Sequence, residues 1–348
     1  MPTTTPPEAP GGDHGAQPRS ATTGPRWQRE LAEAVRDPEE LCRLLHLDPA
    51  VAATARQSRG GFPLLVPRGF VARMEPGNRF DPLLLQVLPV AEELVQQANY
   101  SPDPLAEQGA LRAPGLVQKY AGRALLLATG ACAINCRYCF RRSFPYAENG
   151  ATQAGMAAAV EAIASDATIS EVILSGGDPL LLDDDRLGRL VESLAAIPAL
   201  RRLRIHSRLP IVLPARITEG FVEILTRSRL TAVLVVHANH AAELDSSVAQ
   251  AVRRVAAGGV LVLNQAVLLR GVNDSVAVLV ALSERLIDLG ILPYYLHLLD
   301  HVQGAAHFDI AEDQATALHS ALRAVLPGYA VPRLAREVPG EPAKVWLG

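Results

Sequence analysis

Three cysteines crowd into one short segment, Cys132, Cys136 and Cys139, with the spacing C-x3-C-x2-C and the aromatic Tyr138 before the last of them. Thiolates this close in the sequence can converge on one inorganic centre. Iron–sulfur clusters usually have four thiolate ligands, so a four-iron cluster held by these three would keep one iron open to a small molecule. Zinc cysteines usually come as two close pairs, and the sequence has no second C-x2-C. The spacing favours a cluster, with zinc or inert thiols as the alternative.

The rest of the composition is typical of a globular protein. The chain has 348 residues, of which 49% are hydrophobic, enough to bury a sizeable core in one or two domains. A net charge of −3 gives no basic excess for nucleic acid, and no apolar run is long enough to cross a membrane. The N-terminus lacks the charged and apolar regions of a secretory signal. Three clustered cysteines indicate a reducing cytoplasm, and Cys42, on a helix face, is interpreted as a buried inert thiol.

A regular alternation of apolar runs and helical patterns begins at Arg123. Continuous apolar strands that alternate with helices predict a parallel sheet covered by helices. Six such units can curl into a partial barrel, whereas an eight-unit barrel would need about 250 residues, more than this region holds. We therefore expect an α/β fold with a partial (β/α)6 barrel. The expected strands are 124–129, 171–174, 203–206, 232–237, 260–267 and 293–298, and the expected helices are 152–165, 184–196, 218–228, 241–257, 275–289 and 311–325.

The sequence before the barrel has a different character. Residues 1–25 are rich in Pro, Thr and Gly without apolar periodicity, which predicts a flexible tail. Short helices are expected over 26–58, since Asp37-Pro38 and Asp48-Pro49 each place a capping side chain before a proline at the first helical position. Repeated Pro and Gly predict irregular chain or short strands over 60–89, followed by a helix over 90–97. The expected parts are the tail at 1–25, an N-terminal helical and irregular region at 26–115, the barrel at 116–335 and a C-terminal segment at 336–348.

Polar residues follow the expected strands. In barrels of this kind the loops after the strands form the active face. A polar residue at one strand end can be an ordinary turn residue, but polar residues at six strand ends on the same rim indicate a site. The residues at these positions are the cysteines after the first strand, Ser175-Gly176-Gly177-Asp178-Pro179 after the second, His206 and Arg208 at the third, His237 and Asn239 at the fourth, Gln265 in the fifth and Asp300 after the sixth.

The cysteine segment, together with Ser175-Gly176-Gly177-Asp178-Pro179, resembles the lysine 2,3-aminomutase family of radical S-adenosylmethionine (SAM) enzymes. The resemblance runs from about Gly61 onward and includes the strings over 62–70, 81–88, 263–265, 270–274 and 294–297. It is most similar to the branch that supplies β-lysine for modifying elongation factor P. The resemblance implies a TIM-like radical SAM barrel with an N-terminal helical extension and a C-terminal segment that carries a pyridoxal phosphate (PLP) lysine.

The implied reaction is the isomerisation of L-lysine to β-lysine, an intramolecular amine transfer. Moving an amine to the next carbon requires removal of an unactivated hydrogen atom, which an acid–base residue cannot do. In the family, a reduced [4Fe-4S] cluster cleaves SAM to a radical that can remove this hydrogen atom. PLP holds the migrating nitrogen. The cofactors carry this chemistry and the protein positions them.

The resemblance also assigns cofactor residues. PLP needs a lysine, and this chain has few lysines beside its many arginines. Lys344 matches the PLP lysine, and Arg123 matches the residue that contacts its phosphate, for which a guanidinium is well suited. The implied cluster ligands are Cys132, Cys136 and Cys139, and the implied SAM-binding residues are Gly176, Gly177, Asp178, His237 and Gln265.

Substrate residues follow from the same match. Arg141 corresponds to the arginine that holds the substrate carboxylate in a bidentate contact, whereas Arg142 is interpreted as structural. Asp300 and Glu337 correspond to the two carboxylates that hold the far ammonium of lysine. The family has aspartate at the second position, so the longer reach of Glu337 is a departure. The absence of cysteines after Cys139 predicts that the structural zinc of longer family members is missing.

The implied partners are an electron donor such as flavodoxin or ferredoxin and, indirectly, elongation factor P and its β-lysyl ligase. Nucleic acid and membrane are not expected partners. One alternative is an aminomutase that makes β-lysine as a free metabolite or acts on another amino acid such as glutamate. A different class is a non-catalytic iron–sulfur or zinc-binding module, in which Arg141 and Lys344 would have no purpose.

Overall fold

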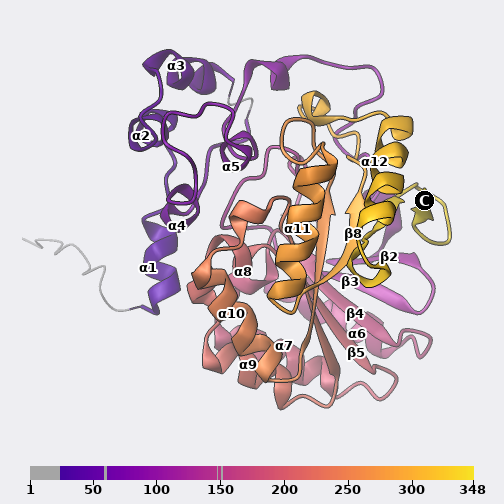
Figure 1. The fold of residues 1–348 in the computed structure, drawn as a ribbon. Coiled ribbons are helices and arrows are strands. Elements are labelled where there is room, and N and C mark those ends of the chain that lie inside the picture. Colours follow the sequence, from indigo (N-terminus) through magenta and orange to yellow (C-terminus); the bar gives the residue numbers. More distant parts are fainter. Residues whose placement is uncertain (1–23, 59–60, 147, 150–151) are drawn as a thin grey trace, which may run out of the picture.

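The computed structural model describes residues 24–58, 61–146, 148–149 and 152–348 (Figure 1). The predicted flexible tail over 1–25 therefore lies almost wholly outside the described residues. Figure 1 shows the N-terminal helices, in indigo and purple, packed beside a larger α/β unit that holds the rest of the chain.

A ten-stranded sheet forms the centre of the fold, and its strands follow one another in chain order. Seven neighbouring strands, β3 to β9, are parallel, while β1, β2 and β10 extend the sheet by antiparallel pairing. The strands are β1 (Leu111–Ala113), β2 (Leu116–Tyr120), β3 (Arg123–Thr129), β4 (Glu171–Gly176), β5 (Arg202–Ser207), β6 (Thr231–Val236), β7 (Leu261–Val267), β8 (Leu292–His297), β9 (Arg333–Arg336) and β10 (Val345–Trp346).

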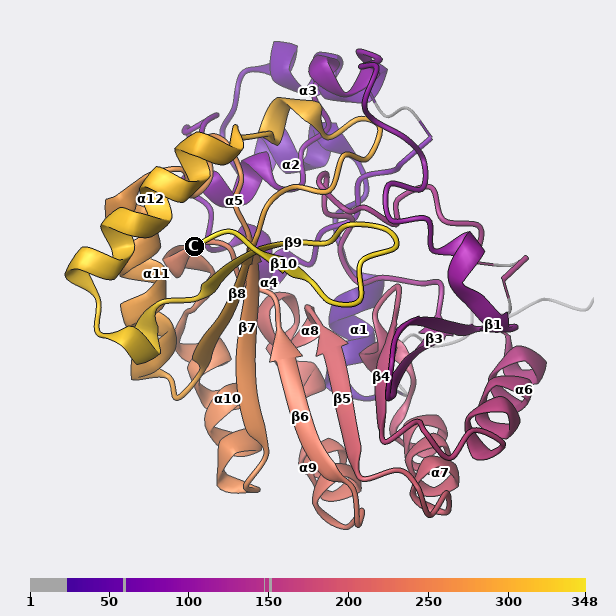
Figure 2. The ribbon, with the colours of Figure 1, turned by 90° about the vertical axis from the view of Figure 1, so that its right-hand side faces the viewer.

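Helices follow each of the first six parallel strands and lie on the outer side of the curved sheet (Figure 2). Five of the six long helices begin at a Ser, Thr or Asp whose side chain accepts a hydrogen bond from a backbone N–H of the first turn. None of the described helices is both long and apolar enough to span a membrane. The long helices are α6 (Gln153–Ala164), α7 (Asp184–Ala195), α9 (Glu219–Thr226), α10 (Ser246–Ala257), α11 (Val276–Asp288) and α12 (Glu312–Val325).

Shorter helices complete this unit. The one-turn α8 (Leu209–Val212) follows β5, and the remaining pieces are single 3-10 turns. These turns are η2 (Gln108–Ala110), η3 (Pro179–Leu181), η4 (Pro214–Arg216), η5 (Ala241–Glu243), η6 (Ala306–Phe308) and η7 (Gly328–Ala330).

The partial (β/α)6 barrel predicted from the sequence is confirmed, with one addition. Strand β9 continues the parallel order beyond the sixth unit and was not predicted. Only Leu334 and Ala335 of this strand are buried, and arginines flank them on both sides. The strand therefore has no apolar run that a sequence pattern could detect.

The N-terminal region is helical, as predicted, but differs in detail. Asp37 and Asp48 cap the second and third helices as expected, and Cys42 is buried in the second. The chain over 61–89 is largely irregular, as predicted, but it forms two one-turn helices rather than short strands, with Pro67 and Pro82 at their starts. The expected helix over 90–97 is a single 3-10 turn. These elements are α1 (Arg26–Ala32), α2 (Pro38–Leu44), α3 (Pro49–Gln57), α4 (Arg68–Val71), α5 (Pro82–Leu85) and η1 (Ala91–Leu94).

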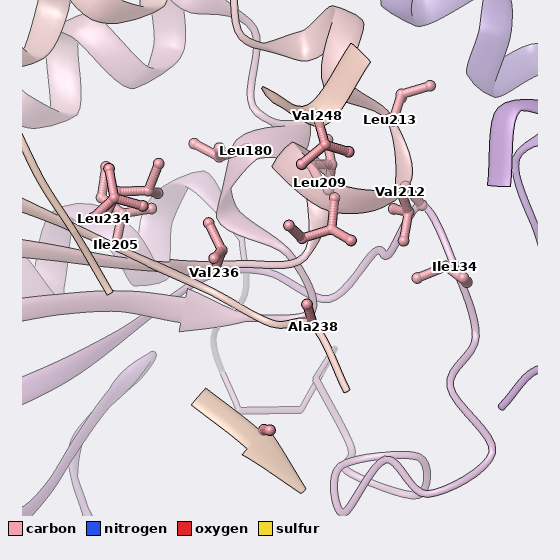
Figure 3. Close-up of a cluster of buried hydrophobic side chains, with 14 of the residues drawn as sticks. Ile134, Leu180, Ile205, Leu209, Val212, Leu213, Leu234, Val236, Ala238 and Val248 are labelled. Atoms are coloured by element: carbon pink, nitrogen blue, oxygen red, sulfur yellow. The ribbon is translucent and has the colours of Figure 1, made fainter. Parts of the chain in front are cut away.

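The hydrophobic core connects the sheet to the cysteine segment. Figure 3 shows Ile205 and Leu234 from adjacent strands side by side, Val248 of α10 beside Leu209, and Ile134 at the edge of the same cluster. Ile134 is 4% exposed and lies between two of the cysteines in the sequence. Burial of this side chain anchors the loop against the barrel. The domain boundaries expected at 115/116 and 335/336 stay predictions, and the sheet runs across both.

Candidate active site

A cavity of about 720 Å³ runs along the inner face of the sheet, a size typical of sites for small molecules and cofactors. Its wall is built from the cysteine segment, the turn after β4, the ends of β5 to β8 and the C-terminal hairpin. Each site residue predicted from the sequence lines this one cavity. These residues are Cys132, Cys136, Cys139, Arg123, Arg141, Gly176, Gly177, Asp178, His237, Gln265, Asp300, Glu337 and Lys344.

The N-terminal region holds the cysteine segment in place. The backbone N–H of Arg137 donates to the carbonyl of Gln86 at 2.9 Å. The Arg137 guanidinium, which is fully buried, pairs through Nε and Nη2 with both oxygens of Glu93, and Arg142 donates to the same carboxylate at 2.7 Å. One buried carboxylate thus pairs with two arginines of the loop.

The three cysteines have an environment that fits a cluster. Arg208 Nη1 lies 2.7 Å from Cys136 Sγ and brings a positive charge to the ligand set. Burial raises the pKa of Cys132, and raises that of Cys139 to about 11, so an iron centre would have to displace these protons. No group of three His, Cys, Asp or Glu side chains among the described residues converges on a single ion. A four-iron cluster does not require that convergence, because each cysteine binds a different iron.

The turn after β4 needs both of its glycines. Gly176 has φ +117°, and a Cβ there would lie 2.4 Å from the carbonyl oxygen of Thr129. A Cβ on Gly177 would lie 2.1 Å from the carbonyl oxygen of Ala131. The turn therefore packs backbone to backbone against the start of the cysteine segment, where only glycine fits.

Asp178 is largely engaged by the neighbouring turn. Its carboxylate accepts hydrogen bonds from the Ser207 hydroxyl at 2.7 Å and from the backbone N–H groups of Leu180, Arg208 and Leu209. Burial raises the pKa of Asp178 to about 6. These contacts tie the turn after β4 to the end of β5.

His237 and Gln265, which the sequence predicts as SAM contacts, lie beside each other. Their side-chain nitrogens, Nε2 in each, are 3.2 Å apart. Burial lowers the pKa of His237 to about 3, so this imidazole is neutral near pH 7 and can accept as well as donate a hydrogen bond.

Arg141 is paired with Glu107, a residue that sequence reasoning missed. Arg141 donates from Nε and Nη2 to the two oxygens of Glu107 at 2.6 and 2.8 Å, and from Nη1 to Ser175 Oγ at 2.9 Å. Although burial opposes it, the Glu107 charge raises the pKa of Arg141 above its usual value. The contacts arrange the guanidinium as a fixed cation in the cavity wall.

Glu337 receives both lysines of the protein. The 348-residue sequence contains two lysines, Lys119 and Lys344. Lys344 Nζ donates to Glu337 Oε2, and Lys119 Nζ donates to Glu337 Oε1 at 2.7 Å. Burial opposes ionisation, but the two ammonium groups, that of Lys344 first, lower the pKa of Glu337 to about 2. The side chain predicted to bind the substrate ammonium is therefore already neutralised by protein cations.

Asp300 has the opposite electrostatic setting. Burial, and then the nearby charge of Glu337, raise the pKa of Asp300 to about 7. A carboxyl in this state is only partly ionised at neutral pH and would ionise fully beside a cation. An incoming ammonium would therefore favour its ionised form.

Arg123 and Lys344 could together hold PLP. Arg123 begins β3, and its guanidinium carbon lies 4.7 Å from the ring centroid of Tyr120 on the cavity wall. A guanidinium fits phosphate and a lysine is the required anchor, so the donor set suits this cofactor. Of the missed residues, Lys119 had a signal in the sequence, the extreme scarcity of lysine, whereas Glu107 had none.

Known proteins similar to this chain point to one family. A family model described as a 4Fe-4S single cluster domain matches residues 120–199, which include the three cysteines. The L-lysine 2,3-aminomutase of Escherichia coli K12 is 51% identical over 92% of this chain and 94% of its own length. The L-lysine 2,3-aminomutase of Haemophilus influenzae is 46% identical over 91% of this chain and 94% of its own length. That of Bacillus subtilis 168 is 33% identical over 92% of this chain and 68% of its own length.

Among solved structures, native anSMEcpe with bound AdoMet has a TM-score of 0.44 and 13% identity, over 57% of this chain and 58% of that one. A radical SAM methyltransferase from Sphaerobacter thermophilus has a TM-score of 0.42 and 18% identity, over 64% of this chain and 68% of that one. The sequence relationships are far closer than these structural ones. On the strength of the 51% identity across nearly the whole chain, this protein belongs to the lysine 2,3-aminomutase family of radical SAM enzymes and is an isomerase of that type.

Proposed function

We propose that the protein converts L-lysine to β-lysine with a [4Fe-4S] cluster, SAM and PLP. The observation that carries the proposal is the convergence of all the family-matched residues on one cavity, although they come from segments as far apart as Arg123 and Lys344. When bound, the cluster and SAM supply hydrogen-atom abstraction, and PLP carries the migrating amine. The aminomutase names of the relatives support lysine as the substrate.

The protein's own side chains have distinct tasks in this proposal. Cys132, Cys136 and Cys139 hold the cluster, and the glycine turn after β4 presents backbone to SAM together with His237 and Gln265. Lys344 anchors PLP and Arg123 contacts its phosphate. Two observations support each of these assignments: the residue matches a family position in the sequence, and it lines the cavity.

Charge at both ends of the substrate would select lysine. Arg141 grips the α-carboxylate, and Asp300 receives the ε-ammonium. Glu337 takes part only if the lysine side chains that now engage it, Lys344 and Lys119, release one of its oxygens. We therefore assign Asp300 the larger share of ammonium binding.

The reaction is tested by anaerobic reconstitution with iron, sulfide and PLP, followed by incubation with L-lysine, SAM and a reductant. Mass spectrometry with chiral derivatisation should find β-lysine, and Cys136→Ala should make none. A preference for glutamate, or no β-lysine from fully loaded protein, would contradict the proposal. The reductant in the cell is proposed to be a flavodoxin or ferredoxin, in the cytoplasm.

We further propose that the β-lysine modifies elongation factor P through its β-lysyl ligase. The support is the resemblance of the longer sequence strings to that branch. Deletion of the gene should leave the factor without its β-lysyl group, and supplied β-lysine should restore it. Persistence of the modification in a deletion strain with no second aminomutase would favour the free-metabolite alternative.

A further inference from the structure

We propose that Glu107 is a positioning residue for the substrate carboxylate. Through its ion pair it holds the Arg141 guanidinium in the orientation that receives an α-amino acid, and it thereby helps the site to distinguish an amino acid from a simple amine. The inference rests on the proposed function, because it takes lysine as substrate and Arg141 as the carboxylate-binding residue.

The contacts of Arg141 leave room for a ligand. A guanidinium has five N–H donors in a planar fork. Glu107 takes Nε and one N–H of Nη2, while Ser175 Oγ and the Gly176 carbonyl, at 2.9 and 3.4 Å, take Nη1. Among the described residues these contacts leave one Nη2 donor without an acceptor, on a side chain that lines the cavity. The guanidinium is thus fixed by these contacts and keeps one N–H for a substrate oxygen, which allows a single contact rather than the bidentate one expected from the sequence.

Glu107 is built into the wall rather than placed there by a flexible surface chain. It is 2% exposed and lines the same cavity. The carboxylate of Asp103 accepts hydrogen bonds from the backbone N–H groups of Glu107 and Gln108 at 3.0 and 3.2 Å. Ala106, directly before Glu107, has φ +50°, a left-handed conformation that a residue other than glycine keeps only where its surroundings hold it.

The Glu107 carboxylate also connects Arg141, through Lys119 and Glu337, to Lys344. Lys119 Nζ lies 3.1 Å from Glu107 Oε1 and 2.7 Å from Glu337 Oε1, and Glu337 contacts Lys344 in turn. Burial alone would raise the pKa of Glu107, but Arg141 and then Lys119 hold it below its usual value. Charges therefore alternate from Arg141 to Lys344 along one side of the cavity.

The test compares lysine with cadaverine, which is lysine without its carboxylate. Protein loaded with cluster and PLP but without SAM binds ligand without turnover, and calorimetry gives both dissociation constants. Wild-type protein should bind lysine more tightly by about 10- to 100-fold, the usual effect of a charged hydrogen bond. Arg141→Met should bind lysine no more tightly than cadaverine. Glu107→Gln should lower the ratio towards that of Arg141→Met, because lysine binding should weaken more than cadaverine binding.

A wild-type ratio in Glu107→Gln would overturn the inference while leaving the proposed function intact. A wild-type protein that does not distinguish lysine from cadaverine would overturn the inference and the role of Arg141, whereas failure of the proposed function would appear as no β-lysine from fully loaded protein. If Glu107→Gln does not fold, Glu107→Asp keeps the charge but shortens its reach, so the ratio should fall partway; an unchanged ratio contradicts the inference. Asp184→Asn is the matched control, because it removes the partner of the buried Arg216 outside the cavity and should leave the ratio unchanged.

Discussion

A Cβ atom on Gly177 would lie 2.1 Å from the carbonyl oxygen of Ala131, the residue before the first cluster cysteine. The glycine turn and the cysteine segment are therefore in direct backbone contact. Whatever the turn does for a bound cofactor, it first has a packing role. A substitution that separates the two backbones must displace the loop that carries Cys132.

This contact predicts that Gly177→Ala will lose iron and stability together. No flexible side chain can yield, because the clashing atoms belong to the backbone. Iron content after anaerobic reconstitution and the thermal midpoint measure the two effects. Gly188→Ala is the control, since a Cβ in helix α7 would meet atoms of Ile224 at no less than 3.8 Å. It should retain iron and stabilise the helix by about 0.5–1 kcal/mol. Full iron in Gly177→Ala would contradict the packing role.

Replacement of any cluster cysteine, for example Cys136→Ala, should remove the bound iron and its brown absorption. Three thiolates already leave one iron open, so a cluster with two has too few anchors. Cys42→Ala should keep both iron and activity, because Cys42 is buried in α2, away from the cavity. Wild-type iron content in Cys136→Ala would refute the ligand assignment.

Borohydride reduction of PLP-loaded protein should place the pyridoxyl label on Lys344. Peptide mapping is unusually decisive here, because Lys119 is the one competing lysine side chain in the sequence. Both lysines contact Glu337, so position alone does not choose between them. Lys344→Met should abolish labelling, whereas Lys119→Met should not. A label on Lys119 would overturn the PLP assignment.

Lysine affinity should fall as the pH is lowered through about 7, since the pKa of Asp300 is raised to about 7 and the ε-ammonium needs its ionised form. Below that pH, binding must release one proton, so the dissociation constant should rise by about tenfold per pH unit. Glu337 and His297, with pKa values of about 2 and about 3, do not titrate in this range. Calorimetry between pH 5.5 and 7.5 measures the slope.

The matched variant for that experiment is Asp300→Asn. It should bind lysine far more weakly, because removing one partner of a buried charge pair costs about 3–5 kcal/mol. Its remaining affinity should lose the change of about tenfold per pH unit that the ionisation of Asp300 causes near pH 7. A wild-type slope in Asp300→Asn would mean that another group carries the proton, and the assignment of Asp300 would fail.

Glu93→Gln should destabilise the protein by about 3–5 kcal/mol, since it leaves buried Arg137 and Arg142 without their countercharge. Urea unfolding of protein without cofactors isolates this effect from iron binding. Glu223→Gln is the control: its pair with Arg227 is exposed, and its loss should cost at most about 1 kcal/mol. Equal stabilities of the two variants would show that Glu93 is not an anchor of the loop.

The parts of the fold and site that the residues themselves predicted share a local signature, whereas the roles of isolated residues such as Asp300 and Lys344 were predicted only from the family resemblance. The cysteine spacing, the glycine turn and the apolar strands are each visible within a few residues. Strand β9 was missed because its two buried residues stand between arginines. Glu107 was missed because its role comes from a contact with Arg141, which lies 34 positions away, and a lone acid in a loop has no distinguishing pattern.

The sheet order, which equals the chain order, has a consequence for how the site is assembled. Each strand pairs with a neighbour that was synthesised just before it, so the sheet can grow from its N-terminal edge by one crossover at a time. The cysteine loop then acquires its barrel support early, from β3 to β5. Glu337 joins the wall only after β9 has paired with β8. A growing chain could thus present thiolates to iron long before it can present a complete site to PLP or lysine.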